Sequence, residues 1–130
     1  MRKIIFLALI VALALAACGG EKTEPSGTYN MVSIDGNELP YAPTHEGQQG
    51  PEIVGGSLTL EVDGTFAFAM DYQIPGGKMQ SSKMRGDYTI EASECTLKWQ
   101  GAGMTACTWE GDQLSFNNEG LIFAFQRAQN

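Results

Sequence analysis

The sequence predicts an all-β protein whose residues 27–127 form an eight-stranded antiparallel up-and-down barrel. From Gly27 onward, apolar and polar residues alternate with period two, and no window of helical length carries an apolar stripe with a period of 3.6 residues. Turn signals such as Asp63-Gly64 separate eight such segments. Eight consecutive antiparallel strands with one apolar face remove their exposed edges most simply by closing into a barrel, and a β-sandwich is the alternative.

The first four strands are expected over residues 27–35, 57–63, 65–74 and 83–92. Each alternates and then meets a turn-forming run, such as the Asp-Gly-Asn after the first strand and the Pro-Gly-Gly after the third. A glycine on an inner face, at Gly86, is typical of a strand that bends or passes close to a bulky neighbour. The predicted inward side chains are Tyr29, Met31 and Ser33, then Leu58, Leu60 and Val62, then Phe66, Phe68, Met70, Tyr72 and Ile74, and last Met84, Tyr88 and Ile90.

The last four strands are expected over residues 95–99, 105–110, 113–117 and 120–127. They are short, and tight turns such as Gly111-Asp112 connect them, which is the pattern of an antiparallel meander. Their predicted inward residues are Cys95, Leu97 and Trp99, then Cys107 and Trp109, then Leu114 and Phe116, and last Leu121, Phe123 and Phe125.

Two cysteines of the predicted barrel, Cys95 and Cys107, are an even number of residues apart. If they face each other across the fifth and sixth strands, Trp99 lies opposite Gly103 and residues 100–102 form a short connection. A structural disulfide is therefore expected, worth roughly 3 kcal/mol in the chain-entropy description of such a short loop. Two free buried thiols, or a reactive or metal-binding pair, are the alternatives.

A long segment over residues 37–56 carries three of the five prolines and the only histidine, His45, beside Glu46. It is expected to fold over the open end of the barrel as a lid, because loops of this length are usually functional or disordered. One histidine and one glutamate are too few for a metal site or an acid–base pair, so a solvated His45 is expected. No serine-nucleophile, phosphate-binding or His-Glu-x-x-His motif occurs, so we expect neither an enzyme nor a cofactor.

The aromatic inner face either fills the barrel or lines a pocket, since an eight-stranded barrel holds side chains or one small ligand. Short strands and many large rings favour filling. If a pocket exists in the barrel mouth beneath residues 40–56, its apolar area and polar handles are expected to come from Tyr72, Tyr88, Trp99 and Trp109.

The N-terminus starts with Arg2 and Lys3 and continues with an unbroken apolar run over residues 4–17. A helix needs about 20 such residues to cross ~30 Å of hydrocarbon, so this run is short for a permanent span. A positive start, a short apolar stretch and small residues at its end are typical of a cleaved signal peptide, which we predict over residues 1–17.

The four residues at the end of this run, Leu15-Ala16-Ala17-Cys18, resemble the lipobox of bacterial lipoproteins. The resemblance implies cleavage before Cys18, whose sulfur would carry a diacylglycerol and whose amine a further acyl chain such as palmitate. Residues 18–26 would then be a lipidated tether, and Gly19 in place of an aspartate implies sorting to the outer membrane. An ordinary signal peptide with a chance cysteine is the alternative.

Composition limits the partners. The formal net charge is −7 and becomes −9 once Arg2 and Lys3 are removed with the leader. An acidic domain with scattered lysines and arginines has no electrostatic footprint for nucleic acid. Anionic lipid head groups would repel it as well, so attachment to a membrane is expected through the N-terminal lipid alone.

The stretch "SGTYNMVSIDGNELP" at residues 26–40 resembles the opening strand of lipocalin-like domains of bacterial lipoproteins. There a Gly-x-Trp begins the barrel, and an arginine at the end of the last strand packs over the tryptophan. In this sequence Gly27-Thr28-Tyr29 stands where that Gly-x-Trp would be, and Arg127 stands where that arginine would be. The resemblance, over residues 26–127, implies that Tyr29 and Arg127 close the base of the barrel by a cation–π contact.

From these patterns we expect an envelope protein, anchored through its lipid outside the cytoplasm at the outer membrane, that binds rather than catalyses. A small apolar or amphipathic ligand in the barrel mouth is the first expectation. The alternative is a protein-binding module, such as an envelope inhibitor of lysozyme or of proteases, acting through its loops.

Overall fold

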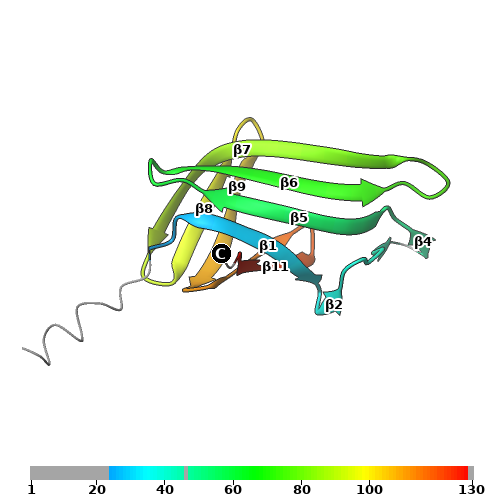
Figure 1. Cartoon of the computed structure of the whole chain (residues 1–130), viewed down its shortest axis with the longest axis horizontal. Helices are drawn as coiled ribbons and strands as arrows, with labels where there is room; N and C mark the ends of the chain where they lie inside the picture. The colour runs from blue at the N-terminus through cyan, green and yellow to red at the C-terminus, as the bar shows by residue number, and fades with distance from the viewer. Residues whose placement is uncertain (1–23, 46, 129–130) are drawn as a thin grey trace, which may run out of the picture.

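Eight long strands pair one after another along the chain and close on themselves in the computed structural model, which describes residues 24–45 and 47–128 (Figure 1). Every pairing is antiparallel, and β1 pairs with both β5 and β11, so the sheet has no open side at that seam. The predicted eight-stranded up-and-down barrel is confirmed. Its strands are β1 (Gly27–Ile34), β5 (Glu52–Leu60), β6 (Thr65–Gln73), β7 (Met79–Glu91), β8 (Glu94–Trp99), β9 (Gly103–Glu110), β10 (Gln113–Asn118) and β11 (Leu121–Arg127).

The predicted signal peptide and the predicted lipid site at Cys18 lie outside the described residues. Within residues 24–45 and 47–128, no helix is long and apolar enough to cross a membrane. Three short strands lie between β1 and β5, namely β2 (Asn37–Glu38), β3 (Thr44–His45) and β4 (Gln48–Gln49).

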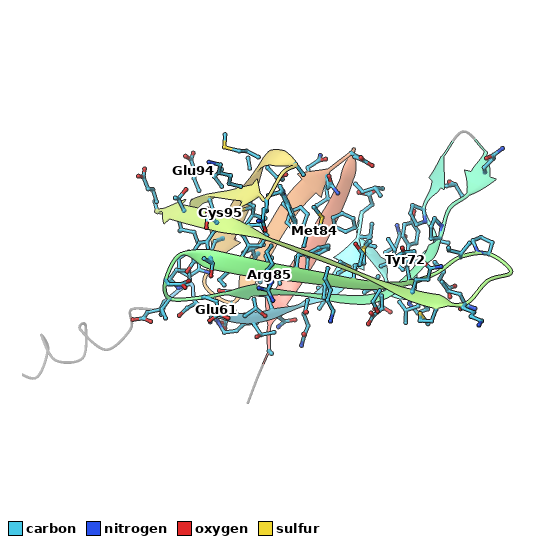
Figure 2. All side chains as sticks on the ribbon, turned by 90° about the horizontal axis from the view of Figure 1, so that it is seen from above. Glu61, Tyr72, Met84, Arg85, Glu94 and Cys95 are labelled. Carbon is cyan, nitrogen blue, oxygen red and sulfur yellow. A yellow bond between two sulfur atoms is a disulfide. The ribbon has the colours of Figure 1, made fainter. Side chains whose placement is uncertain are left out.

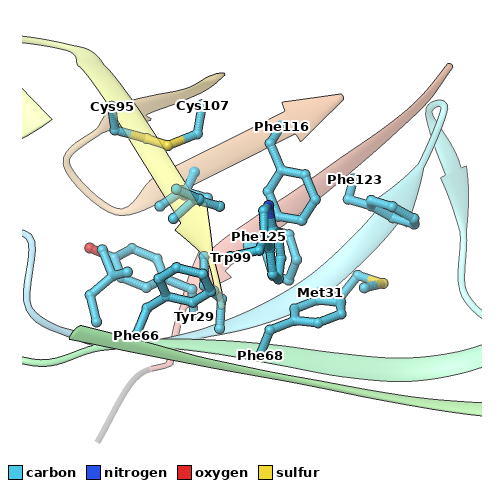
Figure 3. Packing of buried hydrophobic residues seen from close by; sticks show 14 of the residues in the cluster. Tyr29, Met31, Phe66, Phe68, Cys95, Trp99, Cys107, Phe116, Phe123 and Phe125 are labelled. Carbon is cyan, nitrogen blue, oxygen red and sulfur yellow. A yellow bond between two sulfur atoms is a disulfide. The ribbon is translucent and has the colours of Figure 1, made fainter. Parts of the chain in front are cut away.

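Aromatic rings fill the interior of the barrel (Figure 3). Trp99 meets Phe66 and Phe68 edge to face, with ring centroids 5.0 Å and 5.6 Å apart. Phe116 stacks on Phe125 at 5.5 Å and also contacts Trp99. Edge-to-face and offset pairs of this kind are favourable beyond the area that they bury. The centre of the barrel is therefore a packed core.

One predicted inward residue of β1 is wrong. A β-bulge shifts the register between Met31 and Ser33, so the side chain buried after Met31 belongs to Ile34, which is fully buried. A bulge inserts one extra residue and moves the following side chains to the opposite face. Strict alternation therefore predicts that Ser33 points inward, whereas after the bulge the inward side chain is that of Ile34.

Two further predicted inward residues, Val62 and Ile74, lie at strand ends and are 82% and 39% exposed. β5 ends at Leu60, because the Asp63 carboxylate accepts hydrogen bonds from the backbone N–H and the hydroxyl of Thr65 and so forms a turn that contains Val62. β6 ends before Ile74, which begins the turn to β7.

The predicted lid loop is shorter than expected, because its last residues, from Glu52 on, belong to β5. Gly56 lies in this strand because the side chain of Met31 leaves no room there: a Cβ at Gly56 would come within 2.7 Å of the Met31 methyl. Gly56 thus serves close packing and not a turn. Tyr41 closes the shortened loop by exchanging two backbone hydrogen bonds with Ile53, of 3.0 Å and 2.8 Å.

β5, β6 and β7 reach farther than the rest of the barrel at one end (Figure 1). β1 pairs only with residues 57–60 of β5, and β8 pairs only with residues 86–91 of β7. The other ends of these strands pair with β6 and form a three-stranded extension. We call this the open end, and the end where β1 starts and β11 finishes the closed end.

Candidate functional site

An apolar pocket of about 400 Å³ lies at the open end, beneath the loop that carries the β3–β4 hairpin. Three strands supply its walls, with Ile53 from β5, Met70 and Tyr72 from β6, and Leu121 and Phe123 from β11. The loop adds Pro43 and Pro51, and the polar rim consists of Ser82, Asn118 and Glu119. We call this the mouth pocket.

Tyr72 is the polar group best placed to orient a ligand in the mouth pocket. Its ring is half-buried beside Met70, and its hydroxyl donates a long hydrogen bond of 3.4 Å to the side-chain oxygen of Gln80. Figure 2 shows it near the hairpin loop, away from the disulfide. Apolar walls with a few polar groups are typical of sites for small molecules, and the volume lies in the usual range.

A second depression of about 270 Å³ lies on the side of the barrel, where β8 ends and β7 continues. We call it the side window. It is lined by Phe68, Met84, Trp99, Ala102, Thr105 and Phe116, and it shares Asn118 and Glu119 with the mouth pocket. The β10–β11 turn thus lies between the apolar mouth pocket and the more polar side window.

The closed end is sealed by Arg127, whose guanidinium carbon lies 4.8 Å from the centroid of the Tyr29 ring. These are the two residues that the resemblance pairs. Nη1 donates to the carbonyl of Ser26 at 2.7 Å, and Nη2 donates to the carbonyl of Glu24 and to the Tyr29 hydroxyl. Nε contacts a carboxylate oxygen of Asp112 at 3.2 Å.

Tyr29 has no exposed surface, and its hydroxyl connects several parts of the chain. It donates to the carbonyl of Pro25 at 2.6 Å and accepts from Nε1 of Trp109 at 3.0 Å. Gly27 lies directly under Arg127, since a Cβ there would stand 2.7 Å from Nη1. The contacts fix the start of β1 against the end of β11.

Burial raises the pKa of two tyrosines near this end. For Tyr29, burial is the largest effect and outweighs the hydrogen bond from Trp109 and the charge of Arg127, which both lower the pKa. For Tyr88, burial again dominates, and its hydroxyl donates to the carbonyl of Glu61 at 2.6 Å. Both phenols stay protonated at neutral pH and act as hydrogen-bond donors rather than as bases.

The four predicted ligand residues do not come together. Tyr72 alone lines the mouth pocket. Trp99 is in the core, with its Nε1 donating to the Thr105 hydroxyl at 2.8 Å, and it contributes to the wall of the side window. Trp109 and Tyr88 make their hydrogen bonds at the closed end.

The mouth-pocket residues that sequence reasoning missed as a group include Ile53 and Met70. Met70, Leu121 and Phe123 do stand at predicted inward positions, and this was a usable signal. Ile53 gave none, because it lies in a segment rich in glycine and proline that alternation does not describe.

Cys95 and Cys107 lie directly opposite each other on β8 and β9, with their Cα atoms 4.8 Å apart, and a disulfide joins them (Figure 3). Disulfides join Cα atoms 4.4–6.8 Å apart. Trp99 pairs with Gly103, so the predicted register of this hairpin is confirmed. Both cysteines are buried, and the bond fixes one side of the aromatic core.

The described residues contain no group of three or more histidine, cysteine, aspartate or glutamate side chains that could hold a metal ion. His45 lies in β3, where its backbone pairs with Gln48, and Glu46 lies outside the described residues.

Comparison of this chain with protein families, with curated proteins and with solved structures gives no match.

Proposed function

We propose that this protein is a lipid-anchored, lipocalin-like binding protein of the bacterial cell envelope that holds one small apolar or amphipathic ligand at the open end of its barrel. The mouth pocket carries the proposal. Its walls are apolar, Tyr72 offers a hydroxyl, and the loop with Pro43 and Pro51 bounds it on one side. Because rings fill the barrel below, a ligand would insert only its apolar part, and its polar part would remain at the rim.

The position of the pocket supports an anchored binder. The chain enters the barrel at Gly27, at the closed end, and the mouth pocket lies at the opposite end. A lipid on Cys18 would attach the protein through residues before the barrel and leave the pocket facing away from the attachment point. Acyl chains contribute ~0.8 kcal/mol per buried CH₂, and two or more of them make anchoring stable.

A fluorescent anionic amphiphile, 1-anilinonaphthalene-8-sulfonate, tests the pocket on protein purified in mild detergent from an exporting host, with native mass spectrometry to detect a co-purified ligand. We expect one saturable site. Leu121→Trp should fill the pocket and weaken binding at least tenfold. Ile122→Trp is the matched control, because Ile122 is the next residue and is 50% exposed, and it should bind normally. Equal binding by both variants, or no binding by the parent, would contradict the proposal.

The anchor has its own test. Cys18→Ser should abolish incorporation of labelled palmitate and release the protein from the membrane fraction. Continued labelling would contradict the prediction of a lipid on Cys18, and the proposal for the mouth pocket would be unaffected.

A protein-binding module remains the second candidate, and the filled interior favours it. Seven aromatic side chains are buried inside the barrel, so the barrel would act as a rigid support for its loops. A bare mass in native spectra, together with no probe binding, would favour this candidate over the first.

A further inference from the structure

One edge of β7 is free. This strand pairs with β6 from Met79 to Asp87, but with β8 only from Gly86 onward. The last backbone hydrogen bond toward β8 runs from the N–H of Gln100 to the carbonyl of Arg85. Within the part of the chain that the structure describes, residues 79–84 have a neighbouring strand on one side only.

Backbone alternation shows which groups point to the free edge. In an antiparallel sheet, the N–H and C=O of successive residues point to opposite sides of the strand. Because Arg85 faces the β8 side, Ser81 and Lys83 face that side as well, and no strand among residues 24–45 and 47–128 pairs with them there. The edge therefore offers two N–H donors and two carbonyl acceptors to an incoming chain.

The side chains along this edge alternate between two environments. Ser81 and Lys83 are exposed on the outer face, whereas Ser82 and Met84 are half-buried on the inner face. The side window opens next to Met84, where β8 has ended, and Phe68 and Phe116 are among the residues that line it. A strand added to β7 would point every second side chain toward this depression, whose lining combines apolar side chains with Thr105, Asn118 and Glu119. Figure 2 shows Met84 and Arg85 on neighbouring positions of the strand.

The charge along the edge indicates the partner. Three of the five lysines and arginines within residues 27–127 are Lys78, Lys83 and Arg85, on β7 or the turn before it, although the protein as a whole is acidic. Of the nearby carboxylates, Asp71 on β6 accepts a hydrogen bond of 2.6 Å from the Ser81 hydroxyl, and Asp87 on β7 lies opposite Lys98 of β8. Lys83 and Arg85 lie opposite Ala69 and Ala67, which are uncharged.

We propose that the free edge of β7 docks an extended acidic segment of a partner protein by β-strand addition. The partner's backbone pairs with Ser81 and Lys83, its outward carboxylates meet Lys83 and Arg85, and an inward apolar side chain enters the side window. Added strands gain affinity from main-chain hydrogen bonds and specificity from pockets for alternate side chains. This surface is separate from the mouth pocket, and a second copy is a poorer partner because pairing two β7 edges would bring two sets of basic side chains together.

The test uses a synthetic acetylated and amidated peptide of sequence EVEVEFEVE, and the same peptide with lysine in place of glutamate, on the purified protein in 0.15 M salt. We expect the acidic peptide to bind and to slow amide hydrogen exchange at Ser81 and Lys83, and the basic peptide to bind at least tenfold more weakly. Lys83→Glu should weaken binding at least fivefold. Lys98→Glu, with the same charge change on a strand already paired on both sides, should weaken it less than twofold.

Ser81→Pro provides an independent test of the backbone contact. It removes an N–H that points to the free edge and leaves the backbone hydrogen bonds to β6, losing only the hydroxyl contact with Asp71, so the barrel should keep its fold while peptide binding is lost. The proposal is overturned if the acidic peptide protects the 39–51 loop and not Ser81 and Lys83, or if Lys83→Glu and Lys98→Glu bind it equally. Concentration-dependent dimers that protect Ser81 and Lys83 without peptide would overturn it in favour of a second copy.

Discussion

Gly27 shows how a single residue controls the closed end of the barrel. Its φ of 139° lies in a region that side chains rarely adopt, and Arg127 occupies the space where a Cβ would stand. The guanidinium reaches the carbonyl of Ser26 and the Tyr29 ring only because nothing lies between them. The contacts of Arg127 with Ser26 and Tyr29 therefore depend on a residue without a side chain at position 27.

Gly27→Ala should lower the free energy of unfolding by about 1–3 kcal/mol, through backbone strain and displacement of Arg127. Urea denaturation followed by tryptophan fluorescence measures the loss. Gly36→Ala is the control, because Gly36 also has a positive φ, of 80°, but has open space around it. Equal losses for the two variants would mean that the Arg127 contact has no share in the effect.

At Ala92 a substitution by glycine is expected to stabilise the protein, in contrast to Gly27→Ala. It occupies the left-handed region, with a φ of 59°, in the turn between β7 and β8. Relief of that conformation gains about 1–2 kcal/mol, and the added freedom of glycine in the unfolded chain offsets part of it. Ala92→Gly should therefore raise the free energy of unfolding by about 0.5–1 kcal/mol. Ala102→Gly, at a residue without a positive φ, should lower it in the same urea titration.

At the scale of elements, the β8–β9 hairpin combines a short turn, a disulfide and a core tryptophan. The bond between Cys95 and Cys107 closes a loop of sequence separation 12. Its main effect is to restrict the unfolded chain, since the two strands also pair through backbone hydrogen bonds.

Replacing both cysteines, Cys95→Ala with Cys107→Ala, should lower the free energy of unfolding by roughly 3 kcal/mol. A thiol assay on Cys18→Ser protein, unfolded but not reduced, should find no free thiol, and reduction should release two. Two reactive thiols before reduction would mean that the bond does not form in the protein.

The strands were predictable where alternation and turn residues agree, as in β6 and in the β8–β9 hairpin. The starts of β5 and β7 were not, since Gly55-Gly56 reads as a loop and Met79–Ser82 has no apolar alternation. Both segments are strands because β6 pairs with them on its two sides. Pairing with a neighbour is a tertiary effect that a local pattern does not contain.

The candidate site was predictable only in part for the same reason. Tyr72 was found because it stands at an inward position near the end of a clear strand. The mouth pocket also needs Pro43 and Phe123, which are far apart in the sequence and meet only because the barrel closes. The contact between Tyr29 and Arg127 was predicted from the resemblance alone, which pairs residues at the two ends of the barrel sequence.

At the scale of the whole molecule, the two ends of the barrel differ in chemistry. The closed end holds a network of phenol, indole and guanidinium groups, and the open end holds the apolar mouth pocket and, beside it, the side window. We expect stability at high pH to depend on the closed end, and the binding proposed above to take place toward the open end.

Alkaline pH should destabilise the fold through Tyr29 and Tyr88. Both have a pKa raised above the ordinary value of 10.0, so the folded protein holds these protons more tightly than the unfolded chain does. Their contribution is complete below about pH 10 and is lost as the pH rises through the folded values. The urea midpoint should fall between pH 9 and pH 11, and less steeply in Tyr88→Phe; a midpoint that rises with pH would contradict this.

The position of Arg127 also has a mechanical consequence. Arg127 holds the carbonyls of Glu24 and Ser26, the residues through which any pull from the N-terminal side reaches the barrel. Beyond this clamp the force runs along β1, whose hydrogen bonds to β5 and β11 lie across the direction of pull. Hydrogen bonds loaded in shear break together and not one by one. A barrel that is pulled from its N-terminal side should therefore resist unfolding most strongly at the closed end.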